Sequence, residues 1–336
     1  MTSKSMSSKH KPQPFLLQPA CKQTLWGGSL LKTEYGKQAE FDDIAEAWEC
    51  STHPDGVSVV AGGAFCGQKL SQVLQAHPEY LGSHPHAVGE LPILVKFIDA
   101  EKDLSIQVHP DDEYALEHEN SLGKTEMWYI VKARSGAQLV YGFNNDVNYS
   151  IVSQALANNS IMKYLRKVDV HAGDTFFISA GTVHGIGAGN LLVEVQESSN
   201  VTYRLYDYDR VDKSGKKREL NLDKALAVAN FKSSNSPRQP MHIIKYSKGC
   251  ATEFLHRCRY FQVEKIMLNT SEIQQGVCFA ADSLSFMVLV CIAGSGRMLL
   301  NDSSELKINK GQTIFFPAES EVVEVFGKLE FLQIRC

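Results

Sequence analysis

The feature that most constrains the fold of this chain is an internal repeat of short apolar segments. The stretch EMWYIVKARSGAQLV, which begins at Glu126, aligns without a gap with FMVLVCIAGSGRMLL, which begins at Phe286. A second pair, GDTFFISAGTVH from Gly173 and GQTIFFPAESEV from Gly311, aligns in the same way. Two ordered matches of this kind predict two copies of one β unit.

The segments inside and around the repeat have the composition of strands. LPILVKFIDA, MWYIVKA, GDTFFISA and NLLVEVQE are rich in Val, Ile, Phe and Tyr, and Gly, Pro, Asp or Asn bound them. Strand, Ser-Gly turn and strand, followed after a glycine by another strand, is typical of a small jelly-roll barrel of the cupin kind. The sequence therefore predicts a mainly β fold with two cupin (jelly-roll β-barrel) domains.

The expected domain boundaries follow from the repeat and the length of 336 residues, which suits about two domains. We expect a disordered tail over 1–14, a first cupin domain over 15–235 and a second over 236–336. The first copy holds about twenty extra residues, and apolar residues at helical spacing over 149–167 predict a helical insertion there. Helical spacing also appears over 69–81 and 222–231.

Composition and charge exclude several classes of function. The formal net charge of −4 gives no electrostatic basis for binding nucleic acid. The sequence has no run of about 18 apolar residues, which argues against a membrane span. The eight cysteines are scattered without a C-x-x-C pair, so we expect reduced thiols and a cytoplasmic protein.

Polar residues that suit a metal site gather in the first copy and just before it. In SIQVHPDD, Ser105, Gln107 and His109 share one strand face, because successive side chains of a strand alternate. A small barrel can bring this face together with Glu126 and His184. Two imidazoles, a carboxylate and an amide oxygen suit a divalent ion such as Zn²⁺ and leave a position open for water or substrate.

The alignment of the two copies places the site in one barrel. Glu126 aligns with Phe286, and His184 aligns with Val322. Because the polar residues stand in the first copy alone, we expect one Zn²⁺ per chain in a catalytic first domain. The second cupin domain is expected to be metal-free.

Longer motifs resemble a known family. GDTFFISAGTVH resembles the second cupin motif, G-x5-P-x-G-x2-H, with Ser179 in place of proline. LPILVKFIDAEKDLSIQVHPDD, GKTEMWYIV, GDTFFISAGTVHGIGAGNLLVEVQ and TYRLYDYDR together resemble the short, two-cupin mannose-6-phosphate isomerases of bacteria. The resemblance covers about residues 15–336 and rests on long, ordered motifs.

The resemblance implies a ligand set and a reaction. His109, Glu126 and His184 match the zinc ligands of that family, Gln107 matches a fourth ligand, and Arg204 matches the residue usually called catalytic. The implied reaction interconverts mannose 6-phosphate and fructose 6-phosphate through a cis-enediolate, with proton transfer between C2 and C1. A fixed positive charge stabilises the enediolate, a positioned base carries the proton, and Arg or Lys holds the phosphate.

Four further residues are expected in this pocket. Lys96 interrupts the apolar segment PILVKFI, and Lys124 lies two residues before Glu126 on the same strand face. The resemblance makes both of them pocket residues, and Lys124 is also a candidate for catalysis. Glu194, isolated in LLVEVQE, is a candidate acid/base group, with Asp207 and metal-bound water as rivals. Ser105 is expected to reach the sugar or the phosphate, and Lys96, Lys124 and Arg204 to bind substrate.

Other functions stay open on the sequence alone. A related barrel isomerase acting on glucose 6-phosphate would need the same groups. A metal-dependent cupin dioxygenase would use two histidines and a glutamate but leaves Lys96, Lys124 and Arg204 unexplained. A non-catalytic sugar-binding cupin would more plausibly have lost its ligands. The sequence leaves a monomer and a homodimer equally open.

Overall fold

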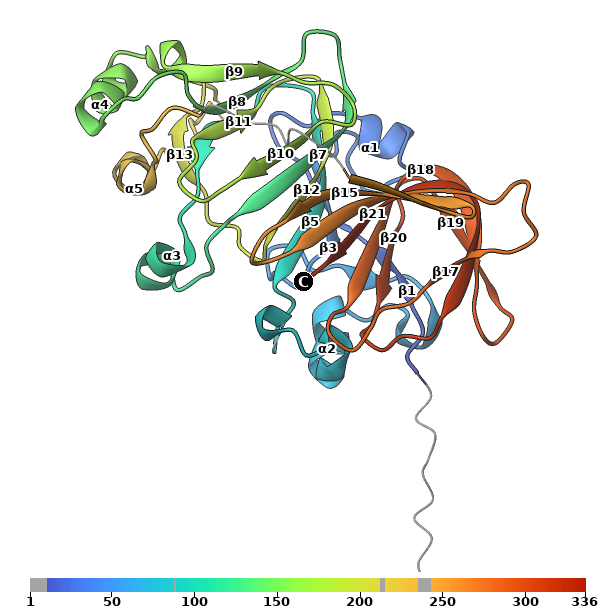
Figure 1. The fold of residues 1–336 in the computed structure, drawn as a ribbon. Helices are drawn as coiled ribbons and strands as arrows, with labels where there is room; N and C mark the ends of the chain where they lie inside the picture. The colour runs from blue at the N-terminus through green and yellow to red at the C-terminus, as the bar shows by residue number, and fades with distance from the viewer. Residues whose placement is uncertain (1–10, 88, 212–214, 235–242) are drawn as a thin grey trace, which may run out of the picture.

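The computed structural model describes residues 11–87, 89–211, 215–234 and 243–336. The chain is mainly β, as predicted, and its strands form two units that lie side by side (Figure 1). Residues 1–10 of the expected tail lie outside the described residues. In the part of the chain that the structure describes, no helix has the length and apolar character needed to cross a bilayer.

The first barrel consists of two facing sheets. The six-stranded sheet has the order β10 (Thr175–Ile178), β7 (Glu126–Ala133), β12 (Asn190–Glu197), β5 (Ile93–Ala100), β3 (Glu46–Cys50) and β2 (Ala20–Lys22). The five-stranded sheet has the order β13 (Tyr203–Tyr206), β6 (Ile106–Val108), β11 (His184–Ile186), β8 (Gln138–Phe143) and β9 (Leu165–Asp169). Trp128, Phe176 and Leu192 are among the apolar side chains that fill the space between the two sheets.

The central strands of the six-stranded sheet are buried on both faces. Every residue of β5 and β12 is buried. One face of these strands looks into the barrel, and the other packs against the second barrel, where Val193 and Phe97 meet Val288 and Leu332. Lys96 and Glu194, which interrupt these apolar strands, are neighbours in the antiparallel pairing and share the interior face.

Helices cover the outer face of the five-stranded sheet, on the side away from the second barrel (Figure 1). The chain forms the helices α1 (Leu30–Thr33), α2 (Leu70–Ala76), α3 (Asp112–Glu119), α4 (Tyr149–Ala157) and α5 (Leu222–Val228). Short 3₁₀ turns lie at Gly63–Phe65, Pro78–Leu81, Pro85–Ala87 and Ile161–Lys163.

The predicted insertion over 149–167 is only partly helical. Asn148 caps α4 by accepting a 2.9 Å hydrogen bond from Ile151 N. The helix ends at Ala157, and Asn159 then takes a left-handed conformation with φ 52°. The last residues of the predicted helix enter β9, because Leu165 and its neighbours pair with β8 and tertiary pairing overrides local helical spacing.

The second barrel is built on one ten-stranded sheet. Its main order is β14 (Ile243–Ser247), β15 (Cys250–Arg257), β16 (Gln262–Asn269), β21 (Val323–Arg335), β18 (Met287–Leu299), β20 (Thr313–Phe316), β1 (Phe15–Gln18) and β4 (Val59–Val60). Outside this path, β17 (Val277–Phe279) pairs with β21 and β19 (Glu305–Asn309) pairs with β18. Two strands of this sheet, β1 and β4, come from the N-terminal part of the chain.

The structure corrects the alignment of the two copies by one residue. Glu126 pairs with Ile178 across β7 and β10, whereas Met287 pairs with Phe316 across β18 and β20. Since Ile178 aligns with Phe316, the structural counterpart of Glu126 is Met287, whose side chain faces the apolar interior.

The predicted counterparts therefore stand on the wrong face. Phe286 packs between the two barrels, and Val322 is half exposed, at 52%. Val323, one residue further on, faces the interior and corresponds to His184. A slip of one residue moves a side chain to the opposite face of a strand, and the gapless sequence match contains no sign of that slip.

Candidate metal centre and active-site pocket

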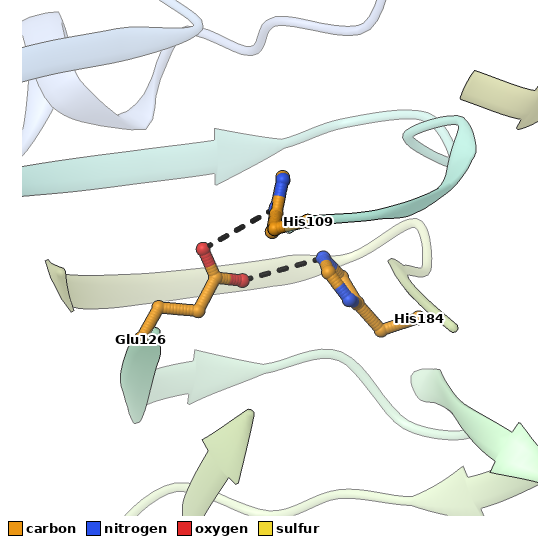
Figure 2. Close-up of side chains that lie close together, drawn as sticks. All are labelled: His109, Glu126 and His184. Atoms are coloured by element: carbon orange, nitrogen blue, oxygen red, sulfur yellow. Dashed lines mark ion pairs between the residues drawn. The ribbon is translucent and has the colours of Figure 1, made fainter. Parts of the chain in front are cut away.

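Three side chains from three strands or strand ends converge inside the first barrel. His109 follows β6, where Pro110 ends the strand, Glu126 begins β7, and His184 begins β11. All three are buried, and their ligand atoms lie within 4.8 Å of one another. Figure 2 shows the Glu126 carboxylate with one oxygen directed at each ring, 3.3 Å from His184 Nε2 and 3.6 Å from His109 Nε2.

Hydrogen bonds outside the cluster orient both imidazoles. His109 Nδ1 donates to Val201 O and His184 Nδ1 donates to Thr182 O, each at 2.8 Å. Both Nε2 atoms therefore present a lone pair to the cluster, which is the usual arrangement of metal-ligating histidines. The buried Oε1 atom of Glu126 has no hydrogen-bond partner among the described residues. These residues fit a divalent metal ion.

The protonation states of the two histidines agree with this assignment. Burial lowers the pKa of His184 to about 4, and burial together with the nearby Lys124 ammonium holds the pKa of His109 well below its ordinary value. Both rings are thus neutral near pH 7 and able to bind a metal ion. Burial and the Glu194 carboxylate raise the pKa of Glu126.

Gln107 lies beside the cluster, as the alternating pattern predicts. It pairs with His184 across β6 and β11, and its Nε2 is 3.4 Å from His184 Nε2. Ser105 is buried on the same face, with its Oγ 3.4 Å from Gln107 Oε1. A half-turn of the amide exchanges its two ends and directs the oxygen at the cluster, as ligation of a metal by Gln107 requires.

Lys124 connects the three candidate metal ligands, His109, Glu126 and His184, to the rest of the pocket. These three residues are called the metal-ligand cluster below. Its Nζ lies 3.1 Å from His109 Nε2, contacts Glu126 Oε2, and is 3.9 Å from Glu194 Oε1. Although burial lowers the pKa of Lys124, the carboxylates of Glu126 and Glu194 outweigh that effect and raise it. A buried ammonium surrounded by carboxylates stays charged.

Glu194 is held between two lysines and a tryptophan. Its Oε1 is 3.3 Å from Lys96 Nζ, and its Oε2 accepts a 2.9 Å hydrogen bond from Trp128 Nε1. Lys96 also lies 3.7 Å from Glu46 Oε2 and 4.8 Å from the centre of the Trp48 ring. Burial acts to raise the pKa of Glu194, but the two ammonium groups lower it on balance, so this carboxylate is ionised.

The pocket opens from this cluster towards β13 and the segment that precedes α5. A cavity of about 170 Å³ has Ser105, Lys96, Lys124, Glu194 and Arg204 in its wall. Arg204 pairs with Gln107 across β13 and β6, so the two side chains emerge side by side. The Nε of Arg204 is buried and has no hydrogen-bond partner among the described residues.

The sequence-predicted site residues are thus brought together, with one exception. Asp207, considered as a rival base, lines no part of this cavity and is held by Arg218 and Arg210 instead.

Sequence reasoning also missed several residues of the pocket. Among them are Glu46, Asn200 and Arg218. Glu46 stands in a strand that has no motif, and Arg218 lies in a polar segment whose composition is that of an ordinary loop. Neither position carries a signal that could have placed it in the pocket.

Family models match both halves of the chain. A model described as phosphomannose isomerase type I, catalytic domain, matches residues 15–155. A second model, described as mannose-6-phosphate isomerase, cupin domain, matches residues 251–335. The two matches follow the order of the two barrels along the chain.

Similar proteins match almost the whole chain. Mannose-6-phosphate isomerase of Streptococcus mutans is 34% identical over 321 residues, which cover 95% of this chain and 97% of that protein. Mannose-6-phosphate isomerase ManA of Bacillus subtilis is 36% identical over 293 residues, covering 85% and 88%. A crystal structure of the mannose 6-phosphate isomerase from Bacillus subtilis superimposes with a TM-score of 0.88 at 31% identity, covering 96% of this chain and 99% of that one.

A more distant structure shares the fold. A mutant of phosphomannose isomerase from Salmonella typhimurium superimposes with a TM-score of 0.75 at 15% identity, covering 96% of this chain and 99% of that one. At this identity the likeness concerns the arrangement of the strands.

Proposed function

This chain belongs to the type I mannose-6-phosphate isomerase family, and from that membership we propose that it interconverts mannose 6-phosphate and fructose 6-phosphate in the pocket beside His109, Glu126 and His184. The observation that carries the proposal is that one cavity wall contains ionised Glu194 and Arg204 together with Gln107 and Lys124. Gln107 and Lys124 in turn contact the buried cluster of His109, Glu126 and His184. An aldose–ketose isomerase needs these groups: a base beside C2 and fixed positive charge beside O1 and O2.

We propose one Zn²⁺ per chain, bound by His109, Glu126, His184 and the Gln107 amide oxygen. Two neutral imidazoles with oxygen ligands and no thiolate are a donor set that zinc accepts in catalytic sites. When bound, such an ion supplies a fixed positive charge for the developing enediolate. Gln107 beside the cluster supports a fourth protein ligand from the same strand face.

Glu194 is proposed as the group that moves the proton between C2 and C1. Its carboxylate is ionised and therefore able to accept a proton, and Lys96 and Lys124 hold it in place. Asp207 is a poorer candidate, because Arg218 and Arg210 occupy its carboxylate and it lies outside the cavity wall. Lys124 is proposed to donate a hydrogen bond to the sugar oxygen beside the metal ligands.

Arg204 is proposed to stabilise the enediolate. Its neighbour across the strands is Gln107, and both side chains lie in the wall of the same cavity, which supports this role. Its main-chain groups are fixed by Asn221, whose N donates to Arg204 O at 2.9 Å. A preorganised guanidinium at that position acts on the charge that develops in the transition state.

We propose that the protein is cytoplasmic and acts as a monomer or a homodimer. The eight cysteines are free thiols, which supports a reducing compartment such as the cytoplasm. Either a monomer or a homodimer is compatible with a site built from one chain.

A coupled assay tests the proposed function. The purified protein should convert mannose 6-phosphate to fructose 6-phosphate, lose that activity after treatment with a chelator, and regain it with added Zn²⁺. Glucose 6-phosphate under the same conditions and an oxygen electrode test the alternative isomerase and the dioxygenase. Conversion of glucose 6-phosphate alone, or oxygen consumption without isomerisation, would exclude the proposal.

A further inference from the structure

The charges around the pocket are unevenly distributed. Three buried or partly buried carboxylates, those of Glu46, Glu126 and Glu194, contact the two lysines at the metal end. The lysine charges are therefore already balanced by protein groups. An anionic substrate group gains little by approaching Lys96 or Lys124.

The opposite end of the pocket has an excess of positive charge. Arg204 donates to a backbone oxygen, Glu219 O at 3.3 Å, and has no carboxylate partner among the described residues. Arg218 and Arg210 share the single carboxylate of Asp207. Of these three guanidinium groups, those of Arg204 and Arg218 lie in the cavity wall. Their mutual repulsion contributes to the lowered pKa of Arg204, after the larger effect of burial, and it exceeds the opposing effect of either the Asp207 or the Glu219 carboxylate.

Arg218 is fixed in position and still has a free hydrogen-bonding edge. Its Nε donates to Asp207 Oδ2 at 2.8 Å and its Nη2 donates to Asp207 Oδ1. Its Nη1 has no partner among the described residues, and Arg218 forms part of the cavity wall. Asp207 is itself only 5% exposed, so its carboxylate is fixed by the surrounding side chains and fixes the guanidinium in turn. A planar guanidinium held along one edge presents its other edge to an anion.

The order of the groups along the pocket matches the two chemically different ends of a sugar phosphate. Arg204 stands beside Gln107 and so beside the metal-ligand cluster. Arg218 follows in a segment that leaves β13 and returns through Glu219 and Asn221, whose groups contact Arg204. Arg218 is a quarter exposed in its side chain, whereas Glu126 at the other end is fully buried. The reacting carbons belong at the buried end and the terminal group belongs at the arginine end.

We propose that Arg218 binds the phosphoryl group of the substrate and that Asp207 is the positioning residue that holds it there. This inference rests on the proposed function for the identity of the substrate. It assigns a different role to each end of the pocket: Lys96 belongs to the carboxylate network at the metal end, and the phosphoryl group is held by the arginine end. Arg218 thereby determines specificity for a phosphorylated sugar over the free sugar.

The test compares Arg218→Gln with Lys217→Gln. Lys217 carries the neighbouring positive charge but pairs with Asp209 at 2.6 Å and lines no part of the active-site cavity. Loss of a charged hydrogen bond predicts that Arg218→Gln raises the KM for mannose 6-phosphate by about 10–100-fold, with kcat changed much less. Inhibition by inorganic phosphate should weaken by a similar factor, and turnover of unphosphorylated mannose should stay as in the parent. Lys217→Gln should leave all three unchanged.

Two outcomes would overturn the inference. One is an unchanged KM and an unchanged inhibition constant for phosphate in Arg218→Gln. The other is an equal loss of activity on mannose and mannose 6-phosphate, which would indicate a structural role.

If Arg218→Gln does not fold, phenylglyoxal modification of the unaltered protein tests whether Arg218 binds phosphate. Inorganic phosphate should protect Arg218, and the absence of protection would contradict the proposal. This readout does not require isomerase activity, so it remains separate from the assay of the proposed function.

Discussion

In the first barrel, the strand face that ends at Pro110 carries Gln107 and His109 into the interior, whereas the corresponding strand of the second barrel carries Phe279 and Ala281. The correspondence follows from the pairing, since His184 lies opposite Gln107 and Val323 lies opposite Phe279. Met287 completes the comparison at the position of Glu126. Each proposed metal-ligand position of the first barrel thus has an apolar counterpart.

This difference distinguishes the residues that the barrel fold requires from those that the proposed reaction requires. The second barrel closes around apolar residues at these positions, and Met287, Phe279 and Val323 contribute to its core. Burying imidazole and carboxylate groups destabilises the fold unless a metal ion or another charged group interacts with them. Their presence in the first barrel is therefore explained by the reaction and not by the architecture that both barrels share.

One pair of positions is polar in both barrels. Where β12 and β5 place Glu194 opposite Lys96, β21 and β16 place Gln333 opposite Glu264. Gln333 Nε2 donates to Glu264 Oε2 at 2.7 Å. The second barrel therefore keeps a cross-strand hydrogen bond at this level without the ammonium groups that keep Glu194 ionised in the first.

The largest effect is expected from removing one proposed metal ligand, compared with the same change at its counterpart in the second barrel. His184→Ala should reduce bound metal from about one ion per chain to a small fraction, and isomerase activity should fall by about 10³-fold or more. The matched change Val323→Ala should cost about 1–3 kcal/mol of stability and leave the metal content unchanged. Elemental analysis and thermal unfolding measure the two results. Full metal occupancy in a folded His184→Ala protein would contradict the assignment.

The next effect concerns Glu194 and its counterpart Gln333. Glu194→Gln keeps the size of the side chain and removes the base, so exchange of the C2 hydrogen with solvent should slow by about 10²–10⁴-fold. Gln333→Ala should leave this exchange unchanged, because the second barrel lies outside the pocket. Proton NMR in D₂O follows the exchange independently of ring opening. A normal rate in a folded Glu194→Gln protein would assign the proton transfer to another group.

The next prediction concerns Arg204, which lies in β13. This strand has no counterpart in the described part of the second barrel. β13 pairs with β6, whereas β17, which corresponds to β6, pairs with β21 alone. Arg204→Lys keeps the charge and loses the planar fork, so kcat should fall by about 10²–10³-fold while KM changes less. Steady-state kinetics separates the two constants. A near-normal kcat with a greatly raised KM would move Arg204 from the enediolate to the phosphoryl group.

The smallest effect is expected where the two barrels meet. Burial raises the pKa of Glu197 to about 8, and the Asp112 carboxylate adds to the shift. Tyr260, from the second half of the chain, donates to Asp112 at 2.9 Å. The folded protein keeps a proton on Glu197 that the unfolded chain releases near pH 4.5, so the free energy of unfolding should fall as the pH rises from about 5 to 8.

Glu197→Gln should remove this dependence. The variant should be more stable than the parent above pH 8, and the difference should shrink towards pH 5. Urea unfolding at several pH values measures it. Parallel stability curves for the two proteins would show that Glu197 is ionised in the folded state.

How far the sequence predicted the molecule depends on the range of each signal. The proposed metal ligands lie in long local motifs, so the sequence could single out His109, Glu126 and His184, which the structure brings together, and Gln107 beside them. The register between the two copies could not, because a slip of one residue changes no residue type in the aligned blocks. Arg218 was missed because its place in the pocket depends on a hydrogen-bonded pair with Asp207, eleven positions away, in a segment without periodicity.

The pairing of β1 with β20 has a consequence for the synthesis of this protein on the ribosome. Phe15 lies opposite Phe315 in the second barrel, so the first strand to leave the ribosome is paired with one of the last to be made. At about 5–20 residues per second, translation of the roughly 300 residues between them lasts ~15–60 s. Until then, the edge of β1 that binds β20 is without its partner, and an unpaired strand edge invites association with other nascent chains. The cell therefore has to protect this N-terminal segment for most of the time needed to make the chain.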